Sequence, residues 1–175
     1  MTIVLVMGVS GSVKTTLGRA LARELNAEFL EGDKFHPESN VAKMSRGEPL
    51  DDADRWPWLD RLSRELARAS AAGRTVVLAC SALKRSYRDR LRRGAPGLRL
   101  VFLKGDKALI LERMRTRTDH FMPPGLLDSQ LAALEEPGLD ESPIVIDVTP
   151  PAEILMGRLP RLLREAPSSA PPPPY

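Results

Sequence analysis

The stretch TIVLVMGVSGSVKTTL, residues 2–17, contains the features that decide the fold. It opens with an apolar, largely β-branched run that ends at a glycine, which predicts a buried strand over Thr2–Met7. Leu17, Leu21 and Leu25 then recur every four residues and predict an amphipathic helix. A buried strand, a glycine-rich loop and a helix in this order are typical of the start of an α/β domain.

The alternation of apolar runs and helical patterns continues along the chain. Further strands are expected at Ala27–Leu30, Thr75–Cys80, Leu98–Leu103 and Ile144–Val148. Apolar residues at helical spacing predict helices over 56–69, 83–91, 110–114, 127–134 and 154–163. Together they predict an α/β fold with a five-stranded parallel sheet flanked by helices. Ligands of such folds bind beyond the carboxyl ends of the strands.

Length and composition limit the class of protein. The 175 residues fit one domain over residues 1–165, and the proline-rich residues 166–175 are expected to form a disordered tail. The net charge of +3 comes without a dense basic block, so we expect no nucleic-acid partner. No apolar stretch approaches the roughly 20 residues that span a membrane, and no secretion signal is recognisable, so a cytoplasmic protein is expected. Cys80 is the single cysteine and is expected to be a buried strand residue.

The loop after the first strand, GVSGSVKT at residues 8–15, nearly matches the phosphate-binding pattern G-x-x-x-x-G-K-[ST]. In this motif backbone N–H groups and the helix N-terminus converge on phosphate oxygens. Lys14 is predicted to reach the β- and γ-phosphates of ATP, and the Thr15 hydroxyl to bind Mg²⁺. The predicted nucleotide-binding residues are Gly8, Ser10, Gly11, Ser12, Val13, Lys14, Thr15 and Thr16.

Val13 stands where the pattern has its last glycine. Glycine is used where the backbone needs a positive φ or must approach a ligand closely. If position 13 is left-handed, a β-branched residue there is strained by roughly 1–3 kcal/mol. Such strain would weaken nucleotide binding about ten- to a hundredfold. The alternative is a slightly remodelled loop that tolerates valine.

Two carboxylates, Glu31 and Asp33, follow the second predicted strand. One could hold a Mg²⁺-bound water, for which Glu31 is the candidate, and the other could accept a proton from a substrate hydroxyl. Taken alone, the pair is more typical of a solvated acidic turn.

Several further motifs stand in a fixed order along the chain. They are E-G-D-K-F-H-P at 31–37, the segment from Asn40 to Leu59, C-S-A-L-K at 80–84, Y-R-D at 87–89, the segment 113–121, and L-L-x-S-Q at 126–130. With the phosphate loop they closely resemble gluconate kinase, a P-loop kinase similar to shikimate and nucleoside-monophosphate kinases. The resemblance runs from about Ile3 to Val148, and Val13 is its one identified departure.

The resemblance implies a nucleoside-monophosphate-kinase-like fold with a lid at about 113–128, and a homodimer. It implies transfer of the ATP γ-phosphoryl group, with Mg²⁺, to the 6-hydroxyl of D-gluconate. The implied catalytic residues are Lys14, Asp33, Arg113 and Arg117, with Asp33 as base or orienting group. The implied substrate-binding residues are Asp33, His36, Lys43, Arg55, Ser81, Lys84, Arg88 and His120. Which cation takes the substrate carboxylate stays open.

Two alternatives remain at this point. The first is a kinase for another small hydroxy acid, such as shikimate, against which the motifs between Gly32 and Leu59 argue. The second is a catalytically defective protein that binds a sugar acid without turnover, for which Val13 is the only support.

Overall fold

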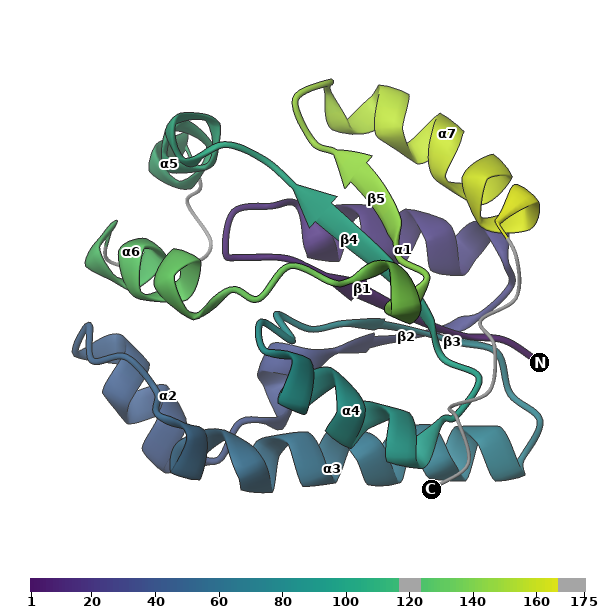
Figure 1. The fold of residues 1–175 in the computed structure, drawn as a ribbon, viewed down its shortest axis with the longest axis horizontal. Helices are drawn as coiled ribbons and strands as arrows, with labels where there is room; N and C mark the ends of the chain where they lie inside the picture. Colours follow the sequence, from purple (N-terminus) through teal and green to yellow (C-terminus); the bar gives the residue numbers. More distant parts are fainter. Residues whose placement is uncertain (117–123, 167–175) are drawn as a thin grey trace.

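The computed structural model describes residues 1–116 and 124–166. Its strands form one parallel sheet in the order β2-β3-β1-β4-β5, which confirms the predicted sheet (Figure 1). The strands are β1 Ile3–Met7, β2 Glu28–Glu31, β3 Val76–Ala79, β4 Arg99–Lys104 and β5 Ile144–Asp147. The helices are α1 Lys14–Glu24, α2 Glu38–Ser45, α3 Asp52–Ala71, α4 Arg85–Gly94, α5 Lys107–Thr116, α6 Pro124–Ala133 and α7 Ala152–Glu165, with short 3-10 turns η1 Gly32–Phe35 and η2 Leu139–Glu141.

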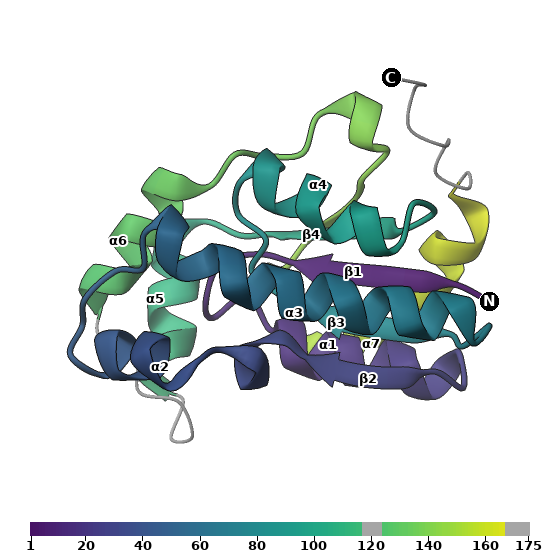
Figure 2. The ribbon, with the colours of Figure 1, turned by 90° about the horizontal axis from the view of Figure 1, so that it is seen from below.

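Helices cover both faces of the sheet. Figures 1 and 2 show α3 and α4 on one face and α1 and α7 on the other. Every residue of β1, the central strand, is buried, and its side chains alternate between two apolar clusters. Leu5 lies opposite Leu78 of β3 and Leu100 of β4 in the register. Burial on both faces explains why the strand sequences are continuously apolar.

Helix α3 begins four residues before the apolar pattern that predicted it. Its first turn is acidic rather than apolar, and a capping box holds it. The Asp51 carboxylate accepts from the Asp54 N–H at 2.7 Å, and the Asp54 carboxylate accepts from the Asp51 N–H at 3.0 Å. Negative charge at a helix N-terminus is favourable. The capping box therefore sets a helix start that apolar spacing does not reveal.

Two other regions bear on the sequence predictions. Helix α2 and the turn η1 were not predicted, because their residues are mostly polar and lack apolar periodicity. Ala166, the first residue of the predicted tail, is the C-cap of α7. Its carbonyl accepts a hydrogen bond from the Arg99 side chain at 2.9 Å. Residues 167–175 and the middle of the expected lid, residues 117–123, lie outside the described part of the chain.

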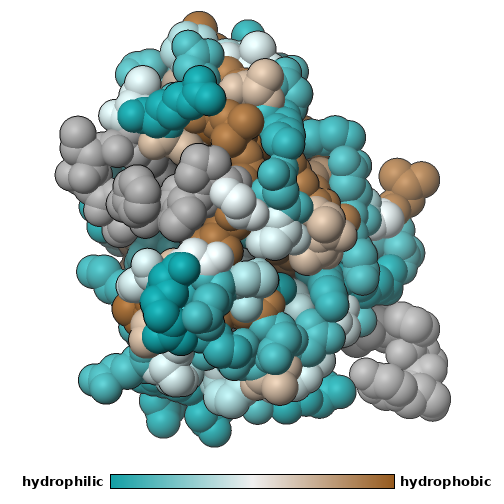
Figure 3. Space-filling model, turned by 90° about the vertical axis from the view of Figure 1, so that its left-hand side faces the viewer, coloured by the Kyte–Doolittle hydropathy of each residue, from teal (hydrophilic) through white to brown (hydrophobic). Residues whose placement is uncertain are grey.

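The carboxyl ends of the strands point toward one end of the molecule, where α2, α5 and α6 lie (Figure 1). Figure 3 looks onto this end, where hydrophilic residues predominate and apolar residues are visible between them. Within residues 1–116 and 124–166, no helix combines the length and the apolar character needed to cross a bilayer.

Candidate active site

The phosphate loop connects β1 to α1 and is folded tightly on itself. Gly11 has φ 78°, and a Cβ there would lie 2.8 Å from Cγ of Met114, so α5 leaves no room for a side chain. Ser12 is fully buried, and its hydroxyl donates to the Val9 carbonyl at 2.6 Å. The Lys14 ammonium donates to the same carbonyl at 2.9 Å. The loop thus has the strand–loop–helix context of a phosphate cradle, with Thr16 exposed in the first turn of α1.

Val13 adopts the left-handed conformation that the sequence analysis considered. Its φ is 60° and its ψ 28°, at the N-cap of α1, and no side chain caps the helix there. The half-buried side chain packs against the apolar cluster between the sheet and α1 and α7. A β-branched residue in this region is a conformational outlier. The condition for backbone strain at position 13 is therefore met.

Thr15 and Glu31, the two predicted Mg²⁺ residues, lie together. The Thr15 hydroxyl donates to the Glu31 carboxylate at 2.6 Å, which joins the start of α1 to the end of β2. A hydroxyl and a carboxylate are hard oxygen donors of the kind that Mg²⁺ prefers, and Mg²⁺ commonly uses one or two such groups besides water and phosphate. The donor set fits this cation.

The acidic segment after β2 also lies beside the end of β3, where Cys80 is buried. Burial is the main cause that raises the pKa of Cys80, to about 12. The charges of Asp33 and Glu31 also raise that pKa, and the charge of Lys14 lowers it. Gly32 lets the chain turn there, because a Cβ at this residue would be 2.5 Å from the Ala79 carbonyl oxygen. The phosphate loop and the acidic segment are thus brought to one place.

His36 is held as a neutral ring by two residues that the sequence analysis did not assign to the site. The ring stacks on Trp58 with centroids 4.0 Å apart. Asn40 donates from Nδ2 to the Asp54 carbonyl at 2.9 Å, and the same Nδ2 lies 3.2 Å from Nδ1 of His36. A carbonyl only accepts, so this assignment makes Nδ1 the acceptor and places the proton on Nε2. Burial and, to a smaller extent, the charge of Arg55 lower the pKa of His36 to about 4, and the charge of Asp33 offsets them in part.

A cavity of about 460 Å³ lies between the start of α3, the region around Lys84 and helix α6. One carboxylate, that of Asp52, organises its polar wall. Asp52 accepts from the Lys84 ammonium at 2.9 Å and from the Tyr87 hydroxyl. The Tyr87 hydroxyl in turn accepts from Nη1 of Arg55 at 3.0 Å. The predicted substrate residues Arg55 and Lys84 therefore share one pocket.

The other predicted substrate residues are distributed around this pocket. Lys43 forms an ion pair with Asp54 at 2.8 Å and does not line the cavity. Ser81 is half-buried directly after Cys80, at the carboxyl end of β3. His120 and the predicted catalytic Arg117 lie outside the described residues.

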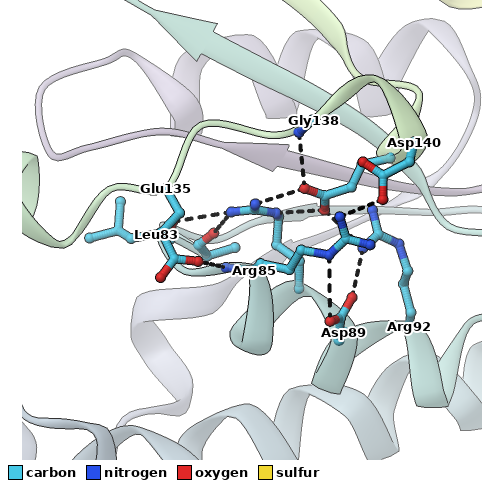
Figure 4. Close-up of polar contacts among 10 residues, drawn as sticks. Leu83, Arg85, Asp89, Arg92, Glu135, Gly138 and Asp140 are labelled. Carbon is cyan, nitrogen blue, oxygen red and sulfur yellow. Dashed lines mark hydrogen bonds and ion pairs between the residues drawn. The ribbon is translucent and has the colours of Figure 1, made fainter.

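The structure contradicts the predicted substrate contact of Arg88. Its guanidinium is fully buried and pairs with both carboxylate oxygens of Glu141 at 2.8 Å. It also donates to the carbonyls of Ala82 and Leu83. Figure 4 shows the surrounding polar contacts, which join the start of α4 to the segment from Glu135 to Asp140. Each guanidinium nitrogen of Arg88 thus has a partner inside the protein, and these contacts join the loop that carries Ser81 and Lys84 to Glu141.

One guanidinium nitrogen of Arg113 is buried without a hydrogen-bond partner among the described residues. Its Nη2 donates weakly to the Pro150 carbonyl at 3.4 Å. Its Nη1 is shielded from solvent and has no hydrogen-bond partner among the residues that the structure describes. Buried guanidinium nitrogens are normally satisfied, so this one is suited to an anionic ligand.

Gln130 of α6 contacts the phosphate loop directly and was missed as a site residue. Its Oε1 accepts from the Ser10 N–H at 2.8 Å, and its Nε2 donates to the Ser10 hydroxyl at 3.1 Å. The adjacent Ser129 lines the 460 Å³ cavity. The motif L-L-x-S-Q contains this pair, but only the fold shows that one residue contacts the phosphate loop and the other lines the cavity.

Comparison with known proteins agrees with this geometry. A family model described as an AAA domain matches residues 3–137. The thermosensitive gluconokinase of Escherichia coli (strain K12) is 48% identical over 145 residues, which are 82% of this chain and 78% of that protein. Solved structures of a sugar kinase from Janibacter sp. HTCC2649 (TM-score 0.89, 48% identity, covering 95% of this chain and 96% of that one) and of a gluconokinase from Sinorhizobium meliloti 1021 (TM-score 0.85, 46% identity, 94% and 93%) also match.

A shikimate kinase from Bacteroides thetaiotaomicron shares the fold alone, with a TM-score of 0.68 at 21% identity over 93% of this chain and 98% of that one. The high identity to named gluconokinases extends over most of the chain. On this evidence the chain belongs to the gluconokinase family of P-loop kinases.

Proposed function

We propose that this protein transfers the γ-phosphoryl group of ATP to the 6-hydroxyl of D-gluconate. The observation that carries the proposal is the meeting of a phosphate loop, a carboxylate and a polar pocket in a chain of the gluconokinase family. The hydrogen bond from Thr15 to Glu31 joins the phosphate loop to the segment that carries Asp33. Gln130 contacts the same loop, and its neighbour Ser129 lines the pocket that contains Arg55 and Lys84.

The phosphate loop supplies the nucleotide site in this proposal. Backbone N–H groups between Gly8 and Thr16 surround the β- and γ-phosphates, and Lys14 exchanges its bond to the Val9 carbonyl for phosphate oxygen. Thr15 and Glu31 would hold Mg²⁺, which neutralises charge on the phosphates when bound. The shielded Nη1 of Arg113 supports a role for this residue in binding the transferred group.

Asp33 is the proposed orienting group and proton acceptor for the substrate hydroxyl. Its side chain is exposed at the carboxyl end of β2, where a substrate can reach it. In-line transfer requires the hydroxyl to be held facing the γ-phosphorus, and catalysis then comes mainly from positioning and charge stabilisation. Lys14, Arg113 and Arg117 contribute that charge in the proposal.

Val13 makes impaired activity part of the proposal. Its left-handed backbone favours a second candidate function, a protein that binds a sugar acid with little or no turnover. The proposed homodimer rests on the family resemblance, and analytical ultracentrifugation tests it. The cytoplasmic location stays an expectation from the sequence.

The decisive experiment measures ADP production with Mg²⁺ and ATP in the presence of gluconate, shikimate or no acceptor. Gluconate-dependent turnover supports the proposal, and equal turnover of shikimate contradicts the gluconate assignment. Turnover by Val13→Gly but not by the natural chain supports the impaired enzyme. If both forms are folded and neither responds to gluconate, the proposed function is wrong.

A further inference from the structure

The ion pairs around the 460 Å³ cavity distinguish its cations from one another. Lys84 pairs with Asp52 at 2.9 Å, and Lys43 pairs with Asp54 at 2.8 Å. Hydrogen bonding to the partner carboxylate raises the pKa of each lysine, which agrees with stable pairing. Two of the candidate cations thus already have a carboxylate partner in the first turn of α3.

Arg55 differs from these lysines because no carboxylate lies within ion-pair distance of it in the described part of the chain. It lines the cavity, and its one hydrogen bond to a described residue is Nη1 to the Tyr87 hydroxyl at 3.0 Å. Its other N–H donors remain for a ligand. A guanidinium can bind both oxygens of a carboxylate through two parallel hydrogen bonds, which an ammonium cannot do.

The surroundings hold the Arg55 side chain in place. Its guanidinium lies 5.3 Å from the centre of the Tyr87 ring, which is buried at the base of α4. The Tyr87 hydroxyl accepts from Arg55 and donates to Asp52, which is the partner of Lys84. Tyr87 therefore connects Arg55 to the Lys84–Asp52 ion pair. A cation fixed in this way loses little conformational freedom when it binds an anion.

The same cavity also presents groups that suit hydroxyls. The carboxylates of Asp51 and Asp52 line it and can accept hydrogen bonds from a polyol, and Ser129 adds a hydroxyl. Arg55, which has no carboxylate within ion-pair distance among the described residues, lies beside these acceptors. The combination matches a ligand with a single carboxylate and several hydroxyls. We infer that Arg55 is the residue that binds the carboxylate of the sugar acid, and that Lys43, Lys84 and Arg88 do not. This inference rests on the proposed function and specifies the acid-binding end of that site.

Calorimetric titration of gluconate in the absence of nucleotide tests the inference independently of Val13. We expect Arg55→Gln to raise the Kd for gluconate about 30-fold, because one partner of a charge-assisted pair is lost. Arg55→Lys keeps the charge but not the fork and should raise the Kd to an intermediate value. Arg64→Gln is the matched control, since it removes the same charge from the exposed surface of the same helix. It should leave the Kd within about twofold of the value for the unsubstituted protein, because surface substitutions away from a site usually change the free energy by less than about 0.5 kcal/mol.

Lys84→Gln and Lys43→Gln separate Arg55 from the other candidates. If either lysine variant weakens gluconate binding as much as Arg55→Gln, or if Arg55→Gln binds normally, the inference is wrong while the proposed function stands. A competition with D-glucitol, which has CH₂OH in place of the carboxylate, adds a second readout. The preference for gluconate over glucitol should disappear in Arg55→Gln and persist in Arg64→Gln. If the natural chain does not bind gluconate at all, the proposed function itself fails.

Discussion

Replacing Val13 by glycine tests whether the strained phosphate loop limits nucleotide binding. The left-handed conformation of a β-branched residue costs about 1–3 kcal/mol. The unliganded loop can relieve this strain by moving position 13 out of the left-handed region, whereas the N–H groups converge on phosphate only in the conformation described. Binding of ATP must then restore the strain, so Val13→Gly should tighten ATP binding about ten- to a hundredfold.

The same substitution should lower the free energy of unfolding of the unliganded protein by about 2 kcal/mol. A free loop that has relieved its strain gains nothing further from glycine, whereas loss of the half-buried valine and the greater chain entropy of glycine in the unfolded state each cost about 1 kcal/mol. Calorimetry with ATP and thermal unfolding measure the two quantities separately. Val13→Ala is the matched variant and should bind with intermediate affinity, because it keeps a Cβ but is not branched. If the Kd for ATP of the valine and glycine forms agrees within about twofold, which is less than about 0.5 kcal/mol, the reasoning is refuted.

Three further predictions follow from buried groups. Glu141→Gln should destabilise the fold by about 3–5 kcal/mol in chemical denaturation, because it leaves the Arg88 charge buried without its partner. Burial would raise the pKa of Glu141, but hydrogen bonds from Arg88 and Arg92 lower it to about 2. Its contribution to stability is therefore complete above pH ~4.5 and is lost as the pH falls toward 2. In Glu141→Gln the free energy of unfolding should depend less on pH in that range. His36, with a pKa of about 4, should show the neutral Nε2–H form in nitrogen-15 NMR spectra at pH 6, and protonation near pH 6.5 would contradict its burial. Cys80 should react with a thiol reagent only after unfolding, since its thiol is buried and its pKa is raised to about 12, and rapid labelling of the native protein would show the opposite.

The sequence predicted the sheet well because the strands are buried on both faces and therefore continuously apolar. The phosphate loop could also be recognised from the sequence, because its residues are contiguous. Arg88 was misread because nothing local indicates that Glu141, 53 positions away, would bury its charge. The pairing of Lys84 with Asp52 across 32 positions was hidden for the same reason. Motifs identify the residues of this site, whereas partners brought in by the fold decide which of them meet a ligand.

Helix α6 has a consequence for how the two ligands influence each other. Gln130 forms hydrogen bonds with Ser10 in the phosphate loop, while its neighbour Ser129 lines the 460 Å³ cavity. A phosphate oxygen that accepts from the Ser10 N–H would compete with Gln130 for it, and any resulting shift of α6 would also reach Ser129. By thermodynamic linkage, the factor by which ATP changes the affinity for gluconate equals the factor by which gluconate changes the affinity for ATP. Helix α6 therefore offers a direct physical route for coupling between the two sites.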